Sequence, residues 1–466
     1  MTSGPSHRTD AIVGAMLAVL LGLMMATEWH GPALFGRAAE VMVLPVVALL
    51  CLNVGWTRRI FVGVALALAG IAAATRDDWL AMVATALHTA AFIAAFFTAL
   101  ASLRNASASS ASIQTCGRFL SDQPPGRRYA ALTMGGHLFG MLLNYGALVL
   151  LGTLAEANAA RERDAEIRGH RIRRMLLAIQ RGFVSTLSWS PLAFAMAIST
   201  KLVPGASWAA AVGPCLVSAA ILAGTGWALD TIFKPRLSHP PPPRTRPEGS
   251  WASLWPLLAL LAVIAVTVGS LHLATGIRAT GVVMVVVPLL SLGWVVIQNL
   301  DHRPFATAAR RALDYSRRDL PAYRGELVLL LMAGFIGTLG SQLVAPLVSE
   351  AGVNLDAVAG WQILVALVWL IPLTGQLGMN PILSVSLVAP ILPPAAQMGL
   401  TPADVIVAIT AGWALSGASS PYTATTLLIG ALGKVSARTV GLRWNGGYTL
   451  VCGVLLSIWV GLQAVL

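Results

Sequence analysis

Charged residues are scarce in this sequence: Asp, Glu, Lys and Arg make up only 11% of its 466 residues. A soluble chain carries about 25% charge, so the composition excludes an ordinary soluble protein. The chain is instead 56% hydrophobic, with a mean hydropathy of +0.75. Apolar runs of about 20 residues, long enough to cross a bilayer, recur along it. The sequence therefore predicts a membrane protein that crosses the bilayer many times.

Acidic side chains are missing from the expected membrane interior. All nineteen Asp and Glu lie in loops or at the ends of apolar runs, which excludes the buried carboxylate relay of many proton pumps. The sequence also lacks an HExxH motif, an acidic pair in a basic loop and a convincing Ser/His/Asp set. An integral-membrane enzyme is therefore only an alternative. A channel or a signalling protein is a second alternative. The two matched broken helices argue against it.

Cysteines are few and irregularly spaced. The four of them show neither disulfide nor metal-ligand spacing: Cys51, Cys116, Cys215 and Cys452. We expect them to pack in the protein interior, and we expect no cofactor other than a coupling ion. The formal charge of +12 is expected to mark cytoplasmic loops rather than a nucleic-acid site, because Lys and Arg concentrate on the cytoplasmic side of membrane proteins.

The basic residues indicate which apolar runs cross the membrane. If run 129–154 crossed once, the arginine-rich stretch 155–181 would lie outside the cell, against the positive-inside rule. We therefore expect 129–154 to be a re-entrant hairpin that enters from the cytoplasm. Its tip is expected at 135–140, since glycine weakens a helix by about 1 kcal/mol. The same argument makes run 357–394, which breaks at 372–381, a hairpin that enters from outside.

The expected fold is an all-α polytopic membrane protein with about eleven transmembrane helices and two re-entrant hairpins in two inverted-topology repeats. Its N-terminus is expected in the cytoplasm and its location in a bacterial inner membrane. The expected spans are 11–27, 40–56, 60–75, 79–103, 182–203, 207–233, 251–270, 279–299, 327–347, 402–430 and 446–466.

The predicted spans group into two halves. The expected parts are an N-terminal tail and first span (1–39), repeat 1 (40–233), a Pro-rich cytoplasmic linker (234–250) and repeat 2 (251–466). Each repeat holds one hairpin and one broken span, 182–203 in repeat 1 and 402–430 in repeat 2. The basic stretches 155–181 and 300–325 are expected to set the topology or to contact anionic lipid.

Two predicted spans carry a matched cluster of hydroxyls and a proline at mid-membrane depth. Trp189-Ser190-Pro191 in one corresponds to Ser419-Ser420-Pro421 in the other. Proline removes a backbone donor and displaces the carbonyl four residues before it, and irregular backbone at that depth is tolerated only in a protein interior or beside a polar cavity. Broken helices that meet hairpin tips are typical of transporters: half-helix N-termini attract anions and freed carbonyls hold cations. We therefore expect a solute site there, with two ordinary serine-patched proline kinks as the alternative.

One known family resembles this architecture. The stretch from Gly378-Met379-Asn380-Pro381 to Pro390, followed by 399–402 and 416–421, resembles the second half of the divalent anion/sodium symporters of the ion transporter superfamily and of their arsenite and tripartite-transporter relatives. The resemblance implies a dimeric elevator, with a scaffold of early spans from each repeat and a moving part of hairpins and broken spans. It implies secondary active transport of a small polar, anionic solute, an organic acid or an oxyanion. Efflux of metalloid or drug-like anions is the alternative.

The expected partners are the anionic solute, membrane lipid and a second copy of the chain, but no nucleic acid. No catalytic residue is expected. The expected substrate-binding residues come from both hairpins and both breaks: Gly136, His137, Asn144, Ser188, Ser190, Pro191, Thr374, Gln376, Gly378, Asn380, Ser416, Ser419, Ser420 and Thr423.

The sequence leaves two coupling ions open, with uncoupled exchange as a further alternative. His137 is the only ionisable side chain expected near the site, and it favours H+. The hairpin tips also lack the Ser-Asn-Thr motif of the sodium/dicarboxylate symporters. Na+ held near Ser190 and Ser420 by freed backbone carbonyls is the alternative.

Overall fold

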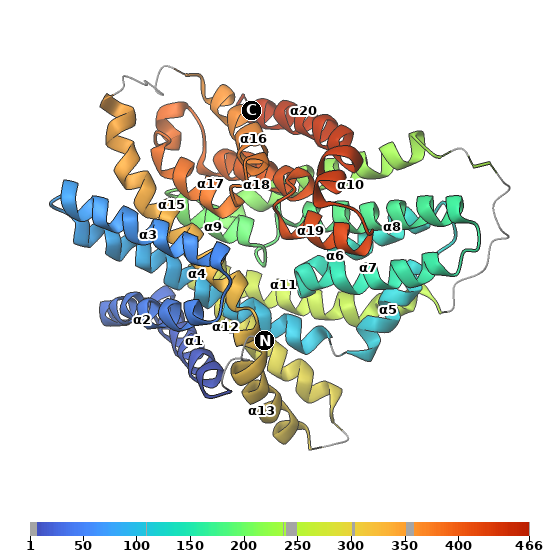
Figure 1. Cartoon of the computed structure of the whole chain (residues 1–466), viewed down its shortest axis with the longest axis horizontal. Helices are drawn as coiled ribbons and strands as arrows, with labels where there is room; N and C mark the ends of the chain where they lie inside the picture. Colours follow the sequence, from blue (N-terminus) through green and yellow to red (C-terminus); the bar gives the residue numbers. More distant parts are fainter. Residues whose placement is uncertain are drawn as a thin grey trace. The chain divides into compact units, whose positions relative to one another are not determined.

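The computed structural model describes residues 7–108, 110–235, 237–238, 249–300, 303–350 and 358–465. In these ranges the chain forms helices joined by short loops, and no strand occurs in them (Figure 1). The predicted all-α fold is therefore confirmed. The tetraproline segment of the predicted linker, 240–243, lies outside the described residues.

Ten helical segments in the described ranges are long and apolar enough to cross a membrane. An α-helix rises 1.5 Å per residue, so about 20 residues match a hydrocarbon core of about 30 Å. These segments correspond to all the predicted spans except 182–203. They are α1 (His7–Glu28), α2 (Ala33–Leu52), α3 (Trp56–Thr75), α4 (Trp79–Ala108), α10 (Trp208–Ile232), η1 (Trp251–Leu254) with α11 (Trp255–Thr275), α12 (Ala279–Gln298), α15 (Arg324–Glu350), α18 (Pro402–Ser419) with α19 (Ala424–Leu432), and α20 (Gly446–Gln463).

The chain divides into two compact units, each built from both predicted repeats. Unit 1 comprises Met1–Ala106, Ile264–Asn354 and Ile382–Leu392. It holds α1 to α3, most of α4, the end of α11, α12, α13 (Pro304–Asp314), η2 (Tyr315–Asp319), α14 (Leu320–Ala322), α15, α17 (Pro381–Val388) and η4 (Ala389–Ile391).

Small residues let the helices of unit 1 approach closely. A Cβ at Gly337 of α15 would overlap Ser386 of α17. Between α2 and α4, His88 Nδ1 lies 3.2 Å from Glu40 Oε1, so this carboxylate has a partner at the point where the two helices meet. The predicted early spans of both repeats thus pack as one body, apart from residues 251–263, which belong to unit 2.

Unit 2 comprises Ser107–Val263, Leu355–Pro381 and Pro393–Leu466. Its elements are α5 (Ala111–Ser121), α6 (Arg128–Leu143), α7 (Tyr145–Ala160), α8 (Ala165–Thr186), α9 (Phe194–Leu202), α10, η1, the start of α11, α16 (Gly360–Gln376), η5 (Ala395–Met398), α18, α19, η6 (Thr439–Trp444) and α20. Both broken spans lie in this unit.

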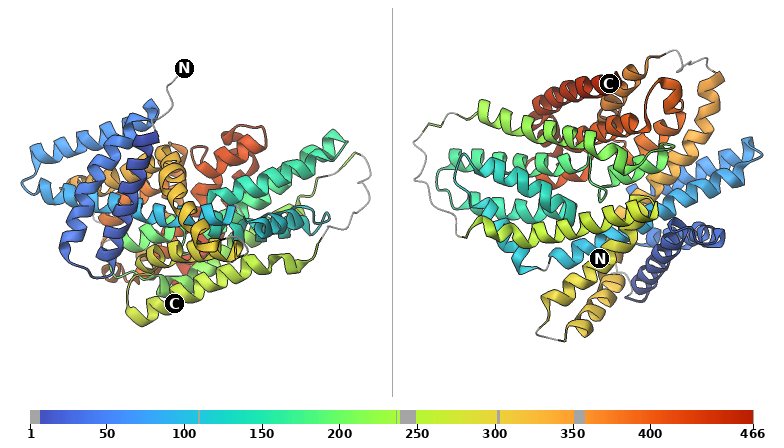
Figure 2. Two further views of the ribbon diagram at one scale, coloured as in Figure 1. Left: turned by 90° about the horizontal axis from the view of Figure 1, so that it is seen from below. Right: turned by 180° about the vertical axis from the view of Figure 1, so that it is seen from behind.

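The run 129–154 forms a helical hairpin, as predicted. α6 and α7 lie side by side and are joined at Asn144 (Figures 1 and 2). Each has 16 residues, which corresponds to about 24 Å and is too short to cross a core of about 30 Å. The chain therefore returns to the side from which it entered, and α8 begins on that side.

The predicted position of the hairpin tip is wrong. The turn lies at Asn144, whose φ is +49°, whereas Gly135, Gly136 and Gly140 all lie inside α6. These glycines allow close packing: a Cβ at Gly136 would overlap the carbonyl of Ile179 in α8. Asn tolerates positive φ better than most residues with a side chain, which explains its place at the tip.

The run 357–394 also turns back on itself in sequence, where α16 ends at Gln376 and α17 begins at Pro381. Gly378 takes φ +94° in this turn, a conformation that strongly favours glycine. The turn thus lies where the sequence predicts it. Its two arms are divided between the units, because α16 belongs to unit 2 and 382–392 to unit 1.

Candidate functional site

Two interrupted helices in unit 2 have the same local geometry. The first break separates α8 from α9 at Ser190-Pro191, and the second separates α18 from α19 at Ser420-Pro421. In the first, Ser190 Oγ accepts a hydrogen bond from the N–H of Leu192, 3.2 Å away. In the second, Ser420 Oγ accepts from the N–H of Tyr422 at 3.3 Å. Each serine thus replaces the carbonyl partner that the broken helix no longer supplies.

The helices that follow the breaks begin without a side-chain cap. α9 starts after Ala193 and α19 after Thr423, and neither residue caps the helix through its side chain. The first N–H groups of a helix have no partner within it. With the positive end of the helix dipole, they form a ready site for an anion.

Glycines place each broken helix directly against its hairpin arm. A Cβ at Gly182 of α8 would overlap the carbonyl of Thr133 in α6. At the corresponding position of repeat 2, a Cβ at Gly412 of α18 would lie 2.7 Å from the carbonyl oxygen of Leu367 in α16. The two repeats thus use the same device to bring a hairpin arm and a broken helix together.

His137 is tied into the first break through both ring nitrogens. Trp189 Nε1 lies 3.2 Å from His137 Nε2, and because an indole N–H only donates, Nε2 accepts. The ring proton is then on Nδ1, which donates to Ser185 Oγ at 2.7 Å. Ser185 in turn donates to the carbonyl of Gly182 at 2.7 Å. The ring also stacks on Trp189, with centroids 5.7 Å apart. This arrangement holds a neutral imidazole.

The arm of the second hairpin is bonded to the second break. Ser420 Oγ donates to the carbonyl of Gly375 at 2.7 Å. Gln376 Nε2 donates to Ser419 Oγ at 3.3 Å. Gly375 must be glycine for this contact, since its Cβ would lie 2.5 Å from Ser416 Oγ. Gly375 in repeat 2 is thus equivalent to Gly140 in repeat 1, which lies against the side chain of Thr186.

The two breaks lie next to each other within unit 2. Gly417, three residues before Ser420, lies against the side chains of Val184 and Leu187 at the end of α8. Gln180 Nε2 donates to the carbonyls of Gly417 and Ala418, both at 3.4 Å. Within unit 2, the second interrupted helix therefore lies against the first close to both breaks.

The remaining predicted residues fall into three groups. Ser188 and Thr374 donate to carbonyls of their own turns, and Ser416 Oγ is buried with no hydrogen-bond partner among the residues that the structure describes. Asn144 and Gly378 form the turns of the two hairpins. Asn380 follows Gly378 in the second turn and is half-buried.

Just after the second break, the predicted residue Thr423 belongs to a hydroxyl cluster whose other members, Thr425 and Thr426, sequence reasoning missed. Thr426 Oγ1 lies 2.6 Å from the carbonyl oxygen of Ser420, and Thr423 Oγ1 lies 3.0 Å from it. Thr425 Oγ1 donates to the carbonyl of Gly417 and lies 2.9 Å from Thr423 Oγ1. Three hydroxyl oxygens and two carbonyl oxygens thus lie close together, and the break at Pro421 deprives the Gly417 carbonyl of its helical N–H partner. The run Thr423–Thr426 in a half-helix could have indicated this cluster.

A buried cation was also missed. Arg181, only 5% exposed, was expected at a cytoplasmic loop, because its many basic neighbours suggested a solvated stretch. Its Nε donates to Asn445 Oδ1 and its NH1 to the Tyr129 hydroxyl, both at 3.0 Å, and its guanidinium lies 4.5 Å from the ring centroid of Tyr448. Arg181 therefore links α6, α8 and α20 below the first break.

The fold is shared with solved membrane transporters. No family model and no curated protein matches the sequence. The YdaH transporter of Alcanivorax borkumensis is similar over 87% of this chain and 98% of its own, with 17% identity and a TM-score of 0.58. MtrF of Neisseria gonorrhoeae, one of a class of antimetabolite efflux pumps, is similar over 90% of this chain and 97% of its own, with 16% identity and a TM-score of 0.56. These likenesses extend over nearly the whole chain and concern its fold.

Proposed function

We propose that this protein is a secondary active transporter that moves a small polar, anionic solute across the bacterial inner membrane. One observation carries the proposal: two Ser-Pro breaks of the same geometry lie side by side in unit 2. Each offers uncapped N–H groups at the start of a half-helix, which suit a carboxylate or an oxyanion. The fold shared with YdaH and MtrF supports transport.

The division into units supports an elevator mechanism. Unit 2 holds the first hairpin, both breaks and the arm α16, whereas unit 1 holds the early spans of both repeats except residues 251–263. We propose that unit 1 is the scaffold of a homodimer and that unit 2 carries the solute. This assignment matches the partition implied by the resemblance to the ion transporter superfamily, to which we propose the chain is related.

Na+ is the coupling ion that the geometry favours over H+. Both nitrogens of His137 are engaged, and protonation would turn Nε2 into a donor facing the donor Trp189 Nε1. The oxygens around the second break suit a hard cation, since such cations prefer oxygen ligands. We propose that Thr423, Thr425 and Thr426 hold Na+ together with the carbonyls of Gly417 and Ser420.

Export is a second candidate direction. MtrF belongs to a class of antimetabolite efflux pumps, and this chain shares its fold. Efflux of metalloid or drug-like anions would use the same site with the solute taken from the cytoplasm. An enzyme remains the alternative of another class. The Ser–His contact at the first break does not support it, because His137 Nδ1 donates to Ser185 Oγ and so does not act as a base toward that hydroxyl.

Binding to the breaks can be tested with a thermal-shift screen of carboxylates, sulfonates and oxyanions, with and without Na+. Once a solute is found, Ser190→Ala and Asn380→Ala should weaken its binding, because each lost hydrogen bond to a charged group costs about 1.5–3 kcal/mol. Ser420→Ala should weaken it indirectly, because Ser420 Oγ bonds the carbonyl of Gly375 and holds the hairpin arm against the break. Ser270→Ala is the matched control, since this exposed serine bonds only its own helix in unit 1. Wild-type affinity in all three site variants would place the site elsewhere.

The coupling ion can be tested in proteoliposomes that contain the purified protein. A Na+ gradient at constant pH should drive uptake, and Thr426→Val should weaken the Na+ dependence. His137→Gln should leave that dependence unchanged. Transport driven by a pH gradient without Na+, and abolished in His137→Gln, would show instead that the histidine carries the proton.

A further inference from the structure

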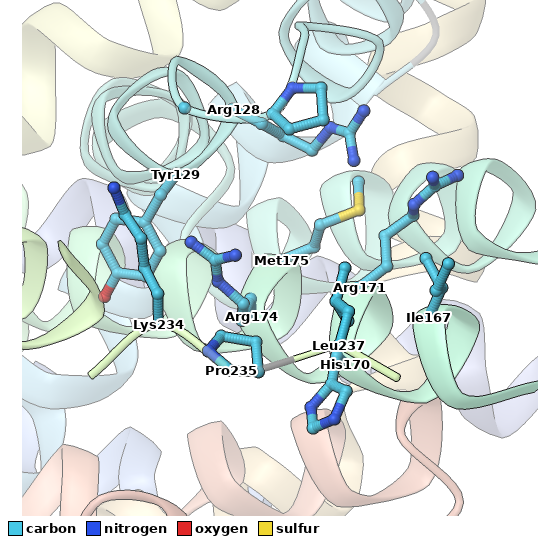
Figure 3. A pocket seen from close by; sticks show the side chains of 12 residues that line it. Arg128, Tyr129, Ile167, His170, Arg171, Arg174, Met175, Lys234, Pro235 and Leu237 are labelled. Carbon is cyan, nitrogen blue, oxygen red and sulfur yellow. The ribbon is translucent and has the colours of Figure 1, made fainter. Parts of the chain in front are cut away.

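A basic pocket lies in unit 2 beside the entrance to the first hairpin. Three segments line it: the start of α6, the first half of α8 and the chain just after α10 (Figure 3). Its volume is about 200 Å³. Its basic residues are Arg128, His170, Arg171, Arg174 and Lys234. It is distinct from the Ser-Pro breaks, which share none of these residues.

The pocket belongs to the cytoplasmic surface of the membrane in the topology derived from the hairpin. α6 and α7 are too short to cross, so the start of α6 and the start of α8 lie on the same side. α10 crosses from the far side and ends at Ile232, close to these two segments. Three segments that enter or leave the bilayer thus meet at the level of the lipid head groups.

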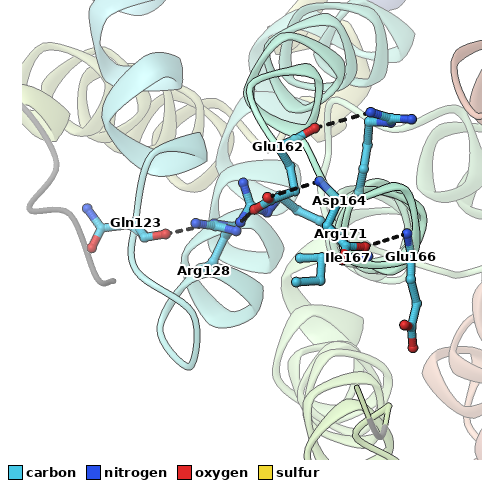
Figure 4. Close-up of polar contacts among 8 residues, drawn as sticks. Gln123, Arg128, Glu162, Asp164, Glu166, Ile167 and Arg171 are labelled. Atoms are coloured by element: carbon cyan, nitrogen blue, oxygen red, sulfur yellow. Dashed lines mark hydrogen bonds and ion pairs between the residues drawn. The ribbon is translucent and has the colours of Figure 1, made fainter. Parts of the chain in front are cut away.

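Two of the pocket's cations have carboxylate partners. Arg174 makes two hydrogen bonds to Asp230, of 2.7 and 2.6 Å. Arg171 NH2 lies 2.7 Å from Glu162 Oε2, as Figure 4 shows. These pairs fix the side chains that form the walls of the pocket.

Of the three remaining basic residues, Arg128 and Lys234 are the Arg and Lys side chains, and they form no ion pair within the described part of the chain. Arg128 Nε donates to the carbonyl of Gln123 at 2.7 Å, which orients its guanidinium (Figure 4). Burial and the neighbouring Arg171 and Arg174 lower the pKa of Arg128 to about 10. It stays charged at neutral pH, and an anion between these cations would relieve their repulsion.

The walls between the cations are apolar. Ile167, Met175, Pro235 and Leu237 line the pocket together with the ring of Tyr129. The chain after α10 is held there because the N–H of Ser238 donates to Glu166 Oε1 at 3.3 Å. A small hydrated anion gains nothing from such walls, whereas a phosphate joined to an apolar chain does.

We propose that this pocket binds the phosphate head group of an anionic phospholipid. Arg128 and Lys234 contact the phosphate, and the apolar walls contact the glycerol and the first acyl carbons. The lipid thereby joins the start of the hairpin to the chain that links the two repeats. This site is independent of the solute site and of its coupling ion.

The test uses the full chain in nanodiscs of phosphatidylcholine with increasing phosphatidylglycerol, with retained lipid measured by native mass spectrometry after gentle detergent transfer. Wild-type protein should retain phosphatidylglycerol. Each of Arg128→Gln and Lys234→Gln should reduce its affinity about five-fold, because a basic residue near anionic lipid contributes about that factor. Lys234→Gln alone keeps the test valid if the Arg128 variant fails to fold, since Lys234 is exposed.

The Arg128→Gln, Lys234→Gln double variant should lose more lipid than either single variant. Its matched control is the Arg118→Gln, Arg163→Gln double variant, which removes the same charge from exposed positions of the same unit. It should retain lipid as the wild type does. Equal loss in both double variants would reduce the effect to general surface charge and overturn the proposal. If inorganic phosphate or glycerol phosphate displaces the lipid at millimolar concentration, the pocket binds a free phosphate and the proposal of a lipid ligand is overturned.

Discussion

Gly182 is the residue on which the contact between hairpin and broken helix most depends. A Cβ there would overlap the backbone of Thr133, which cannot move aside as a side chain can. We expect Gly182→Ala to destabilise the protein by about 1–3 kcal/mol, the usual cost of overpacking a core. A lowered midpoint of thermal unfolding, measured by size-exclusion chromatography of heated samples, is the expected result.

Gly224→Ala is the control for this change. Gly224 lies in the interior of α10, is not followed by proline, and has no atom within 4 Å of its would-be Cβ. Alanine favours a helix over glycine by about 1 kcal/mol, so this variant should be as stable as the wild type or slightly more stable. Equal stability of Gly182→Ala would show that α6 and α8 can separate at no cost.

The glycines also show what a single sequence conceals at this scale. Gly135, Gly136 and Gly140 suggested a flexible tip, because composition does not distinguish a turn from a close helix contact. The actual turn uses Asn144. Ser190-Pro191 and Ser420-Pro421 were located correctly, because proline breaks a helix by local chemistry that needs no knowledge of the fold. Arg181 was missed since its burial depends on partners more than 260 residues away, Trp444 and Asn445.

At the scale of elements, the arginine distribution predicted the first hairpin correctly. The positive-inside rule places the arginine-rich stretch 155–181 in the cytoplasm, and α6 and α7 are indeed too short to cross the membrane. The extent of α8 was not predicted. The helix begins at Ala165, but its first half is rich in charged residues, so hydropathy does not indicate that it continues into the apolar run as one helix. Hydropathy alone detects only the part of a helix that lies in lipid.

The hairpin can be tested by labelling with a membrane-impermeant maleimide. Single cysteines at 165 and 310 should react only in inside-out vesicles, because both positions lie on the cytoplasmic side when 129–154 re-enters. Both residues are exposed in the structure, so access is not limited by burial. A cysteine at 77, predicted outside, is the control and should react in intact cells. Reaction at 165 from outside would show that 129–154 crosses the membrane.

At the scale of the whole molecule, the division into units does not follow the chain. Unit 1 combines 264–354 from the second repeat with the first 106 residues, and unit 2 combines the breaks of both repeats. A single sequence reveals where repeats begin and end, but it does not show which parts of the two repeats pack together. The glycine contacts that build unit 2 become recognisable only when their partner helices are known.

The elevator proposal predicts that the two units move as rigid bodies. Spin labels can be placed at exposed positions, 77 and 310 in unit 1 and 118 and 168 in unit 2. Distances within each unit, measured by pulsed electron spin resonance, should stay the same with and without Na+ and solute. The distance between 168 and 310 should change, because a solute that prefers one state shifts the population toward it. If the distances within unit 2 change while the distance between units does not, unit 2 opens locally instead, and the solute is released by movement of the hairpin arms against the breaks.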